Sequence, residues 1–316
     1  MGAFAFELAV VMLTAALIGI MYHEDFYRGP IPPEAQAACP EHLKELCRMP
    51  INDHIMPRAN VAVLGISLIG CMVSLDVFGA DVAVARRYQS WGLPVLPYAI
   101  GGFGVHSAIL TLPPLVYSII FRQLVTPPQT FAEDYGWSFA VYWTASAFGY
   151  FGSVAVAREK SQVCAVFLVL SAFVFSGAPL RLPELRRVLG DFIYEVATSS
   201  SYIRWALEAA YIQEAVYHQR SYDVSGGMEF FGLVMGNRSR DLAWIFAIGA
   251  VFRAATYAAL LARQPSSNWR KGALGGRVRA ALAAGRRARA GHVELAEVEV
   301  GRDSPTGARA EKVEHV

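Results

Sequence analysis

Six apolar blocks of about the length needed to cross a lipid bilayer constrain this chain more than any other feature. They cover residues 3–21, 61–79, 106–121, 137–157, 162–180 and 243–262. A helix of roughly 20 apolar residues crosses a hydrocarbon layer of about 30 Å. Only 17% of the residues are charged, whereas about 25% are charged in a typical soluble domain. The sequence therefore predicts an all-α integral membrane protein with six transmembrane helices.

The first block is typical of a membrane span and not of a cleaved signal peptide. No basic residue precedes it, it carries Glu7, and no small-residue cleavage pattern closes it. Residues 1–262 are expected to form one membrane domain. Residues 263–316 are rich in Arg, Ala and Gly and lack apolar periodicity, which predicts a disordered tail. The segment from Tyr202 to Tyr217 has helical apolar spacing but is too polar to span a membrane.

Lys and Arg are distributed unevenly between the two sides of the predicted bundle. Six spans place both termini on one side, and eight basic residues with no acidic one lie between Arg263 and Arg289, directly after the last span. Because Lys-rich and Arg-rich segments near span ends stay in the cytosol, we expect both termini to be cytoplasmic and residues 22–60 to be external. The tail is also a candidate for binding anionic lipid, although a role in fixing topology alone explains its charge.

Two of the four cysteines, Cys39 and Cys47, lie in the polar loop after the first span. An oxidising compartment on that side favours a local disulfide between them. A zinc site with His42 and His54 is the alternative, but the loop contains no close Cys-x-x-Cys pair. We expect the disulfide and no metal site.

Catalytic motifs are not recognisable in this chain. Residues 224–229 (VSGGME) are similar to the signature sequence of an ABC ATPase. That signature acts opposite a phosphate-binding loop, and the chain has no GxxxxGK[ST] segment that would form one. We therefore expect a turn at 224–229, with no catalytic residue and no cofactor on this chain.

Three charged residues fall inside the predicted spans: Glu7, Asp76 and Arg253. Charges at such positions often mark ion or proton pathways. Glu7 and Asp76 lie near span ends, so we expect them to reach the membrane interface, whereas Arg253 is expected to face the bundle interior. So few intramembrane charges argue against a proton-coupled carrier and favour a machine that is powered from outside the membrane domain.

The order and spacing of several short segments give this chain a resemblance to a known family. From the N-terminus they are Tyr27–Pro30, Cys39-Pro40, Leu46-Cys47, Ser74–Gly79, Ala85–Gly92, Leu96–Tyr98, Pro114–Tyr117, Pro127 with Phe131, Gly149-Tyr150, Gly177–Leu180 and Ser201–Ala209. Over about residues 8–262 the chain resembles the membrane domain of G-subfamily ABC exporters (the white and pleiotropic drug resistance type). The resemblance is greatest to the algal, oomycete and plant branch.

The resemblance implies a type-2 ABC exporter membrane domain with a re-entrant outer hairpin between the fifth and sixth spans. The hairpin would contain Arg204, Trp205 and Glu208, and the spacing of Arg204 and Glu208 predicts an ion pair one helical turn apart. A substrate cavity is expected between the second and fifth spans, and its candidate residues are Met72, Phe173 and Phe175.

The resemblance also implies partners. A cytosolic coupling helix with Arg86, Arg87, Tyr88 and Gly92 would contact a nucleotide-binding domain that holds ATP and Mg²⁺. Relatives carry that domain before the first span, so we expect it either on another polypeptide or on a part missing from this sequence. A second membrane domain would complete the transporter as a homodimer or heterodimer in the bilayer, and no nucleic-acid partner is expected.

The function that follows is ATP-driven export of lipid-like or amphipathic hydrophobic compounds. An ATP-independent multi-pass channel or carrier is one alternative, and a non-functional truncated transporter product is another. The sequence leaves open whether the host is the plasma membrane or an organelle membrane.

Overall fold

A computed structural model describes residues 2–23, 27–29, 53–79, 95–180, 182–219, 221–234, 236 and 238–262. The chain divides into two units, Met1–Arg263 and Gln264–Val316, and all of the described residues lie in the first. The predicted disulfide (Cys39, Cys47), the predicted coupling helix (Arg86, Arg87, Tyr88, Gly92) and the predicted tail lie outside the described residues.

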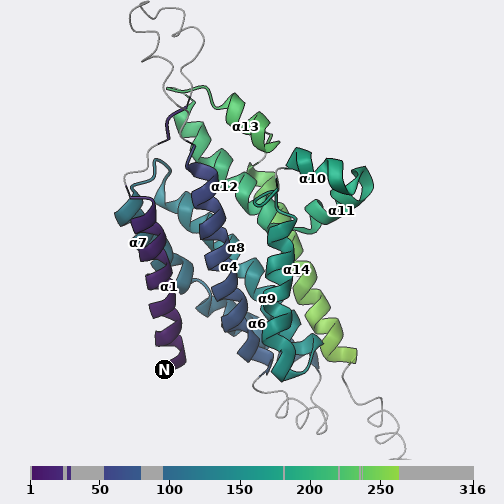
Figure 1. Ribbon diagram of the computed structural model, residues 1–316. Helices are drawn as coiled ribbons and strands as arrows, with labels where there is room; N and C mark the ends of the chain where they lie inside the picture. Colours follow the sequence, from purple (N-terminus) through teal and green to yellow (C-terminus); the bar gives the residue numbers. More distant parts are fainter. Residues whose placement is uncertain are drawn as a thin grey trace, which may run out of the picture. The chain divides into compact units, whose positions relative to one another are not determined.

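Nearly all of the described residues are helical, which confirms the predicted all-α class. The helices are α1 (Gly2–Met21), α4 (Ile55–Gly79), α6 (Val95–Ile109), α7 (Leu112–Val125), α8 (Phe131–Ala155), α9 (Arg158–Val174), α10 (Leu182–Leu189), α11 (Asp191–Ser200), α12 (Tyr202–His218), α13 (Ser225–Phe231) and α14 (Arg238–Ala262). Figure 1 shows the long helices α1, α4, α8, α9 and α14 running alongside one another, with α10 to α13 gathered near one end.

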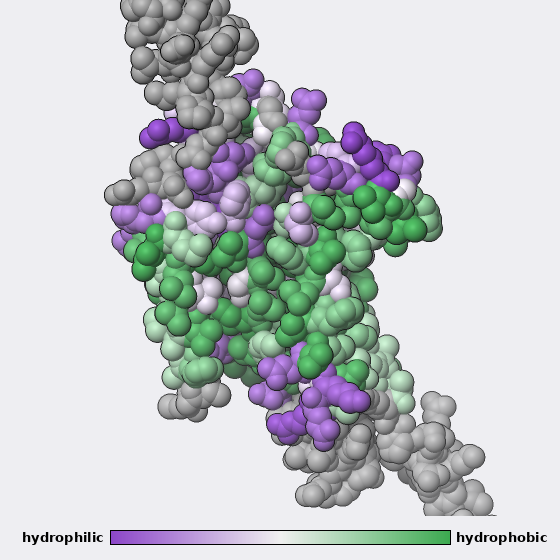
Figure 2. All heavy atoms as spheres, viewed as in Figure 1, coloured by the Kyte–Doolittle hydropathy of each residue, from purple (hydrophilic) through white to green (hydrophobic). Residues whose placement is uncertain are grey.

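Four stretches of the described residues are long and apolar enough to cross a membrane: Phe4–Met21, Ile55–Phe78, Leu96–Val125 and Arg238–Ala262. Figure 2 shows the corresponding surface, with hydrophobic side chains over the middle of the molecule and hydrophilic ones toward both ends. The protein is therefore a multi-pass integral membrane protein. The total of six spans stays a prediction, because α9 has only 17 residues and α8 carries many Ser, Thr, Tyr and Trp side chains.

The third predicted span, 106–121, differs from the structure. The apolar stretch begins at Leu96 and consists of two helices, α6 and α7, with a break at Leu110 and Thr111. Pro113 and Pro114 occupy the first turn of α7. Proline has no N–H to donate to the preceding turn but suits the start of a helix, so the pair begins a new helix here.

Helix α8 lies at the centre of the packing and contacts α4, α7, α9, α12 and α14. Its closest neighbour is α4. A Cβ atom added at Gly149 of α8 would overlap the backbone carbonyl oxygen of Cys71 in α4. Small residues at this crossing bring the two backbones into direct contact, a common way of packing membrane helices.

Candidate functional site

Helix α12 contributes Gln213 and Glu214 to the candidate site, and two hydrogen bonds fix its position. Ser201, which caps its N-terminus, donates to the carbonyl oxygen of Ala172 in α9 at 2.5 Å. The indole of Trp137 in α8 donates to the carbonyl oxygen of Ala206 at 2.8 Å. The helix also contacts α4, α11 and α14. With α8 and α9, its side chains therefore meet those of five neighbours at this end of the bundle, which we call the hairpin end.

The first element of the site is a buried ion pair. Arg58, in the first turn of α4, donates to the carboxylate of Glu214 in α12, and the two side chains are only 8% and 6% exposed. The imidazole Nε2 of His218 lies 3.7 Å from the other oxygen of Glu214. Burial opposes the charged form of Glu214. The hydrogen bond with His218 and the charge and hydrogen bond of Arg58 outweigh this effect, so the pKa of the carboxyl is lowered.

The second element is a cluster around Asp134, near the start of α8. Its carboxylate accepts hydrogen bonds from Arg122 at 2.5 Å, from the amide of Gln129 at 2.6 Å and from the amide of Gln213 at 3.4 Å. The connection from α7 to α8 brings Arg122 and Gln129 close to Asp134. It turns at Thr126, whose φ is 47°, and a capping box between Thr130 and Glu133 then starts α8.

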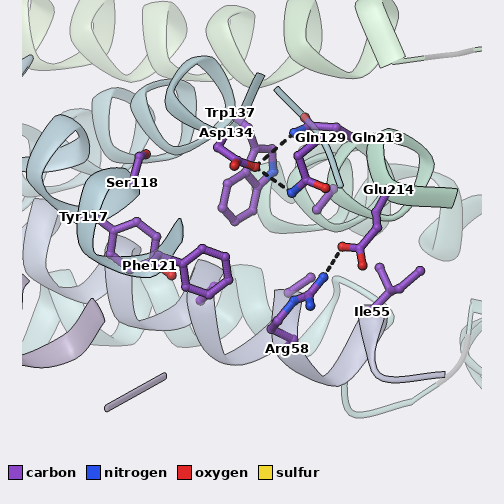
Figure 3. Close-up of a pocket in the computed structure, with 13 residues that line it drawn as sticks. Ile55, Arg58, Tyr117, Ser118, Phe121, Gln129, Asp134, Trp137, Gln213 and Glu214 are labelled. Carbon is purple, nitrogen blue, oxygen red and sulfur yellow. Dashed lines mark hydrogen bonds and ion pairs between the residues drawn. The ribbon is translucent and has the colours of Figure 1, made fainter. Parts of the chain in front are cut away.

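A small cavity lies between the Arg58–Glu214 ion pair and the Asp134 cluster. It is lined by residues of α4, α7, α8, α12 and the connection before α8 (Figure 3). The volume open to the centres of water molecules is about 40 Å³, enough for roughly two or three waters. Tyr117 and Phe121 lie on one side of the cavity, the Asp134 cluster on another, and the Arg58–Glu214 pair completes it. The lining residues are Ile55, Arg58, Ala59, Ala62, Tyr117, Ser118, Phe121, Gln129, Asp134, Trp137, Ala210, Gln213 and Glu214.

Three buried atoms of the lining have no hydrogen-bond partner among the residues that the structure describes. They are the hydroxyl oxygen of Tyr117 and the amide oxygens of Gln129 and Gln213. The three residues are 3%, 8% and 4% exposed. Buried polar groups without partners are costly, so these three atoms lower the stability of this part of the bundle.

The predicted hairpin residues lie on the first half of α12, beside α14. Arg204 donates to the Thr198 hydroxyl at 3.2 Å and stacks over the Trp205 ring, with its guanidinium carbon 4.5 Å from the ring centroid. The carboxylate of Glu208 lies 3.6 Å from a guanidinium nitrogen of Arg240 in α14, and the charge of Arg204, its predicted partner, also acts on it. Burial raises the pKa of Glu208, and the charges of Arg204 and Arg240 oppose that shift.

Arg253 faces α8, inside the packed helices. Its guanidinium donates a hydrogen bond to the backbone carbonyl oxygen of Trp143 at 2.9 Å and another to the hydroxyl of Ser146 at 2.9 Å. The guanidinium carbon also lies 3.5 Å from the centroid of the Trp143 ring. The expectation that this arginine points toward the bundle interior is therefore confirmed, and aromatic and carbonyl groups stabilise its charge.

The expectation for Glu7 is wrong. Its side chain does not reach the membrane interface but is buried, and its carboxyl accepts a hydrogen bond from Tyr142 of α8 at 2.6 Å. The side chain of Asp76 is 82% exposed and lies 4.0 Å from Arg158, and its place at the membrane interface stays a prediction. Glu7 differs because the face of α1 on which it lies packs against the bundle.

The predicted substrate-cavity residues do not line the cavity described above. Phe173 packs against the main core, whereas Phe175 packs against the small cluster of Leu182, Leu185 and Tyr194. Met72 is partly exposed on α4. The structure thus does not bring Phe173 and Phe175 into one group, and the role of all three stays a prediction.

The polar residues of the cavity were not singled out from the sequence. Arg58 precedes the predicted second span, Asp134 precedes the fourth, and Glu214 lies in a segment predicted only to be an amphipathic helix. The sequence did contain a signal for them. Charged residues at the border of an apolar block are expected to pair with opposite charges when the block is buried. Within the described residues no group of three or more His, Cys, Asp or Glu side chains is arranged to hold a metal ion.

Comparison with known families shows to which family the chain belongs. Residues 53–265 match the model of a family described as "ABC-2 type transporter", which covers more than half of the chain. A search of curated proteins found no match. The match begins just before α4 and ends just after α14, so it includes every element of the hairpin end. The chain therefore belongs to the ABC-2 type transporter family.

Proposed function

We propose that this chain is the membrane subunit, or the membrane domain, of an ATP-driven exporter of the G subfamily that moves lipid-like or amphipathic hydrophobic compounds. The observation that carries the proposal is the match to the ABC-2 type transporter family over residues 53–265. Transport by this chain then needs ATP hydrolysis elsewhere, on a nucleotide-binding domain that another chain or another part of a longer protein supplies. The segment with Arg86 and Arg87 is the proposed contact for that domain.

The outer face of α9 supports pairing with a second membrane domain. Val163, Phe167, Leu170 and Val174 follow one another at spacings of four, three and four residues, and they are 71%, 68%, 43% and 46% exposed. This spacing places them along one stripe of the helix, as at the contacting positions of paired helices. A stripe on one helix of each copy fits a symmetric dimer.

Cysteine crosslinking tests the pairing. In a background without native cysteines, Phe167→Cys is expected to form a crosslinked dimer in native membranes on mild oxidation. Phe246→Cys, at a partly exposed apolar position of α14, is the matched control and is expected to remain monomeric. Equal crosslinking of the two variants would argue that α9 faces lipid.

Purification and reconstitution test the transport proposal. The full chain, affinity-purified from its native membrane, is expected to bring with it an ATPase subunit or to be part of a longer ATPase polypeptide. In proteoliposomes the complex should move a fluorescent lipid analogue with ATP but not with a non-hydrolysable analogue of ATP. ATP-independent flux by the chain alone, with no ATPase present, would overturn the proposal and favour a channel or carrier.

A further inference from the structure

We propose that Glu7 and Tyr142 form a proton-binding site inside the helix bundle, in which the Glu7 carboxyl carries a proton at neutral pH. The site joins α1 to the central helix α8. The inference does not rest on the proposed function, because it concerns the protonation of one side chain and not transport.

Burial of the Glu7 carboxyl is the first argument. Glu7 lies in the candidate membrane span Phe4–Met21 and is only 7% exposed. Its carboxyl accepts a hydrogen bond from the Tyr142 hydroxyl at 2.6 Å, and Tyr142 is 2% exposed. Within the part of the chain that the structure describes, this hydroxyl is the only hydrogen-bond or ion-pair partner of Glu7. One neutral donor does not replace the water around an ionised carboxylate, which accepts several hydrogen bonds.

The absence of a free cation is the second argument. The helices α1, α4, α7 and α8 contain two basic residues, Arg58 and Arg122. Both are paired with other carboxylates, Arg58 with Glu214 and Arg122 with Asp134. Ionisable side chains inside a membrane bundle usually pair with one another or with backbone carbonyls. Glu7 has neither kind of partner among the described residues.

Other titratable groups on these helices do not offer an alternative partner. Apart from Tyr142, each contacts a different group: Cys71 the carbonyl of Ala165, Asp76 Arg158, Glu133 Arg238, Tyr135 the carbonyl of Thr111, and Tyr150 His106, while Tyr117 lines the cavity at the hairpin end. A divalent metal ion as the counter-charge would need several oxygen ligands. No group of three or more His, Cys, Asp or Glu side chains in the described ranges is arranged to supply them.

A proton is therefore the ligand that this site can hold. Burying an ionised carboxylate without a partner is far more costly than burying a neutral polar group, and such a carboxylate binds a proton instead. The protonated acid keeps its contact with α8, because the Tyr142 hydroxyl can still donate to the carbonyl oxygen of the acid.

Infrared spectroscopy of the purified full chain in lipid nanodiscs at pH 7 tests the protonation. The carbonyl stretching band of protonated carboxyl groups is expected to lose one component in Glu7→Gln, which keeps the size and the acceptor oxygen of the side chain. Asp76→Asn is the control, because the Asp76 carboxylate is 82% exposed and should not contribute to that band. An unchanged band in Glu7→Gln would overturn the proposal.

A pair of tyrosine variants locates the proton. Tyr142→Phe removes the hydrogen bond to Glu7, so one component of the band should remain but move to higher frequency. Tyr202→Phe removes the hydroxyl of another fully buried tyrosine and should leave the band in place. No shift in Tyr142→Phe, or the same shift in both variants, would contradict the assignment. This comparison still decides the question if Glu7→Gln fails to fold.

The pH dependence of unfolding gives an independent readout. If folded Glu7 holds a proton that the unfolded chain releases, the folded state binds more protons, and stability falls as the pH rises. From pH 5 to pH 7 the unfolding equilibrium constant of the unmodified chain should rise relative to that of Glu7→Gln by up to about tenfold per pH unit. A ratio that stays constant or falls would mean that Glu7 is ionised in the fold. None of these results bears on the transport experiment.

Discussion

The ion pair between Arg58 and Glu214 allows a quantitative test of how the hairpin end is held together. Both side chains are more than nine-tenths buried, so removing one partner leaves the other charge buried without the group that neutralises it. Breaking such a pair costs about 3–5 kcal/mol, whereas replacing both charges with apolar groups of similar volume costs little or even stabilises. We expect Arg58→Met and Glu214→Leu each to lower the free energy of unfolding by about 3–5 kcal/mol.

The double variant separates this explanation from simple loss of packing. Arg58→Met combined with Glu214→Leu should lose no more than about 2 kcal/mol, which corresponds to a coupling free energy of about 4–8 kcal/mol in the double-mutant cycle. The measurement is reversible unfolding of the purified chain in bicelles by a denaturing detergent, followed by circular dichroism. If the double variant loses the sum of the two single losses, the side chains are energetically independent and the reasoning is refuted.

An exposed ion pair in the same chain provides the control. Asp76 and Arg158 lie 4.0 Å apart, with side chains that are 82% and 69% exposed. Exposed pairs contribute about 0–1 kcal/mol, so Asp76→Asn should hardly change unfolding. A loss as large as that of Glu214→Leu would show that burial does not set the energy of these pairs.

Three further changes test other parts of the structure. Gly149→Ala should strongly destabilise the chain in the same unfolding assay, because its Cβ would overlap the carbonyl of Cys71, whereas a Cβ at Gly136 meets nothing within 4 Å and Gly136→Ala should be neutral or slightly stabilising. Thr130→Ala removes the cap of α8 and should cost about 1 kcal/mol; no change would mean that the capping box does not contribute. The pKa of Glu214 is lowered in the folded protein, so its stabilisation is present at neutral pH and is lost as the pH falls below the ordinary range of a glutamate. Unfolding measured from pH 7 to pH 3 should show a smaller pH dependence in Glu214→Gln, and an unchanged profile would contradict this assignment.

The apolar blocks predicted most of the long helices because crossing a membrane requires a minimum length of apolar chain. The position of the helix break at Leu110 and Thr111 was not predicted. The sequence shows Pro113 and Pro114, but a proline in a membrane helix either kinks it or starts a new one. Only the neighbouring backbone decides between these outcomes.

The candidate site was predictable only in part. Arg253 was recognised because a charge in the middle of an apolar block must face other protein groups. Arg58 and Glu214 are 156 residues apart, and nothing in their local sequence shows that α4 and α12 are neighbours. The burial of Glu7 was missed for the same reason, because its environment depends on Tyr142 in α8.

The separation of 156 positions between Arg58 and Glu214 along the chain also sets an order of events during synthesis. At roughly 5–20 residues per second, Arg58 is made on the order of 10–30 s before the carboxylate that neutralises it. During that interval α4 has no Glu214 to bind, and its first turn is more stable near water and lipid headgroups than in a closed bundle. The hairpin end therefore becomes fully closed only after α12 has been made, which makes its assembly a late step in the biogenesis of this protein.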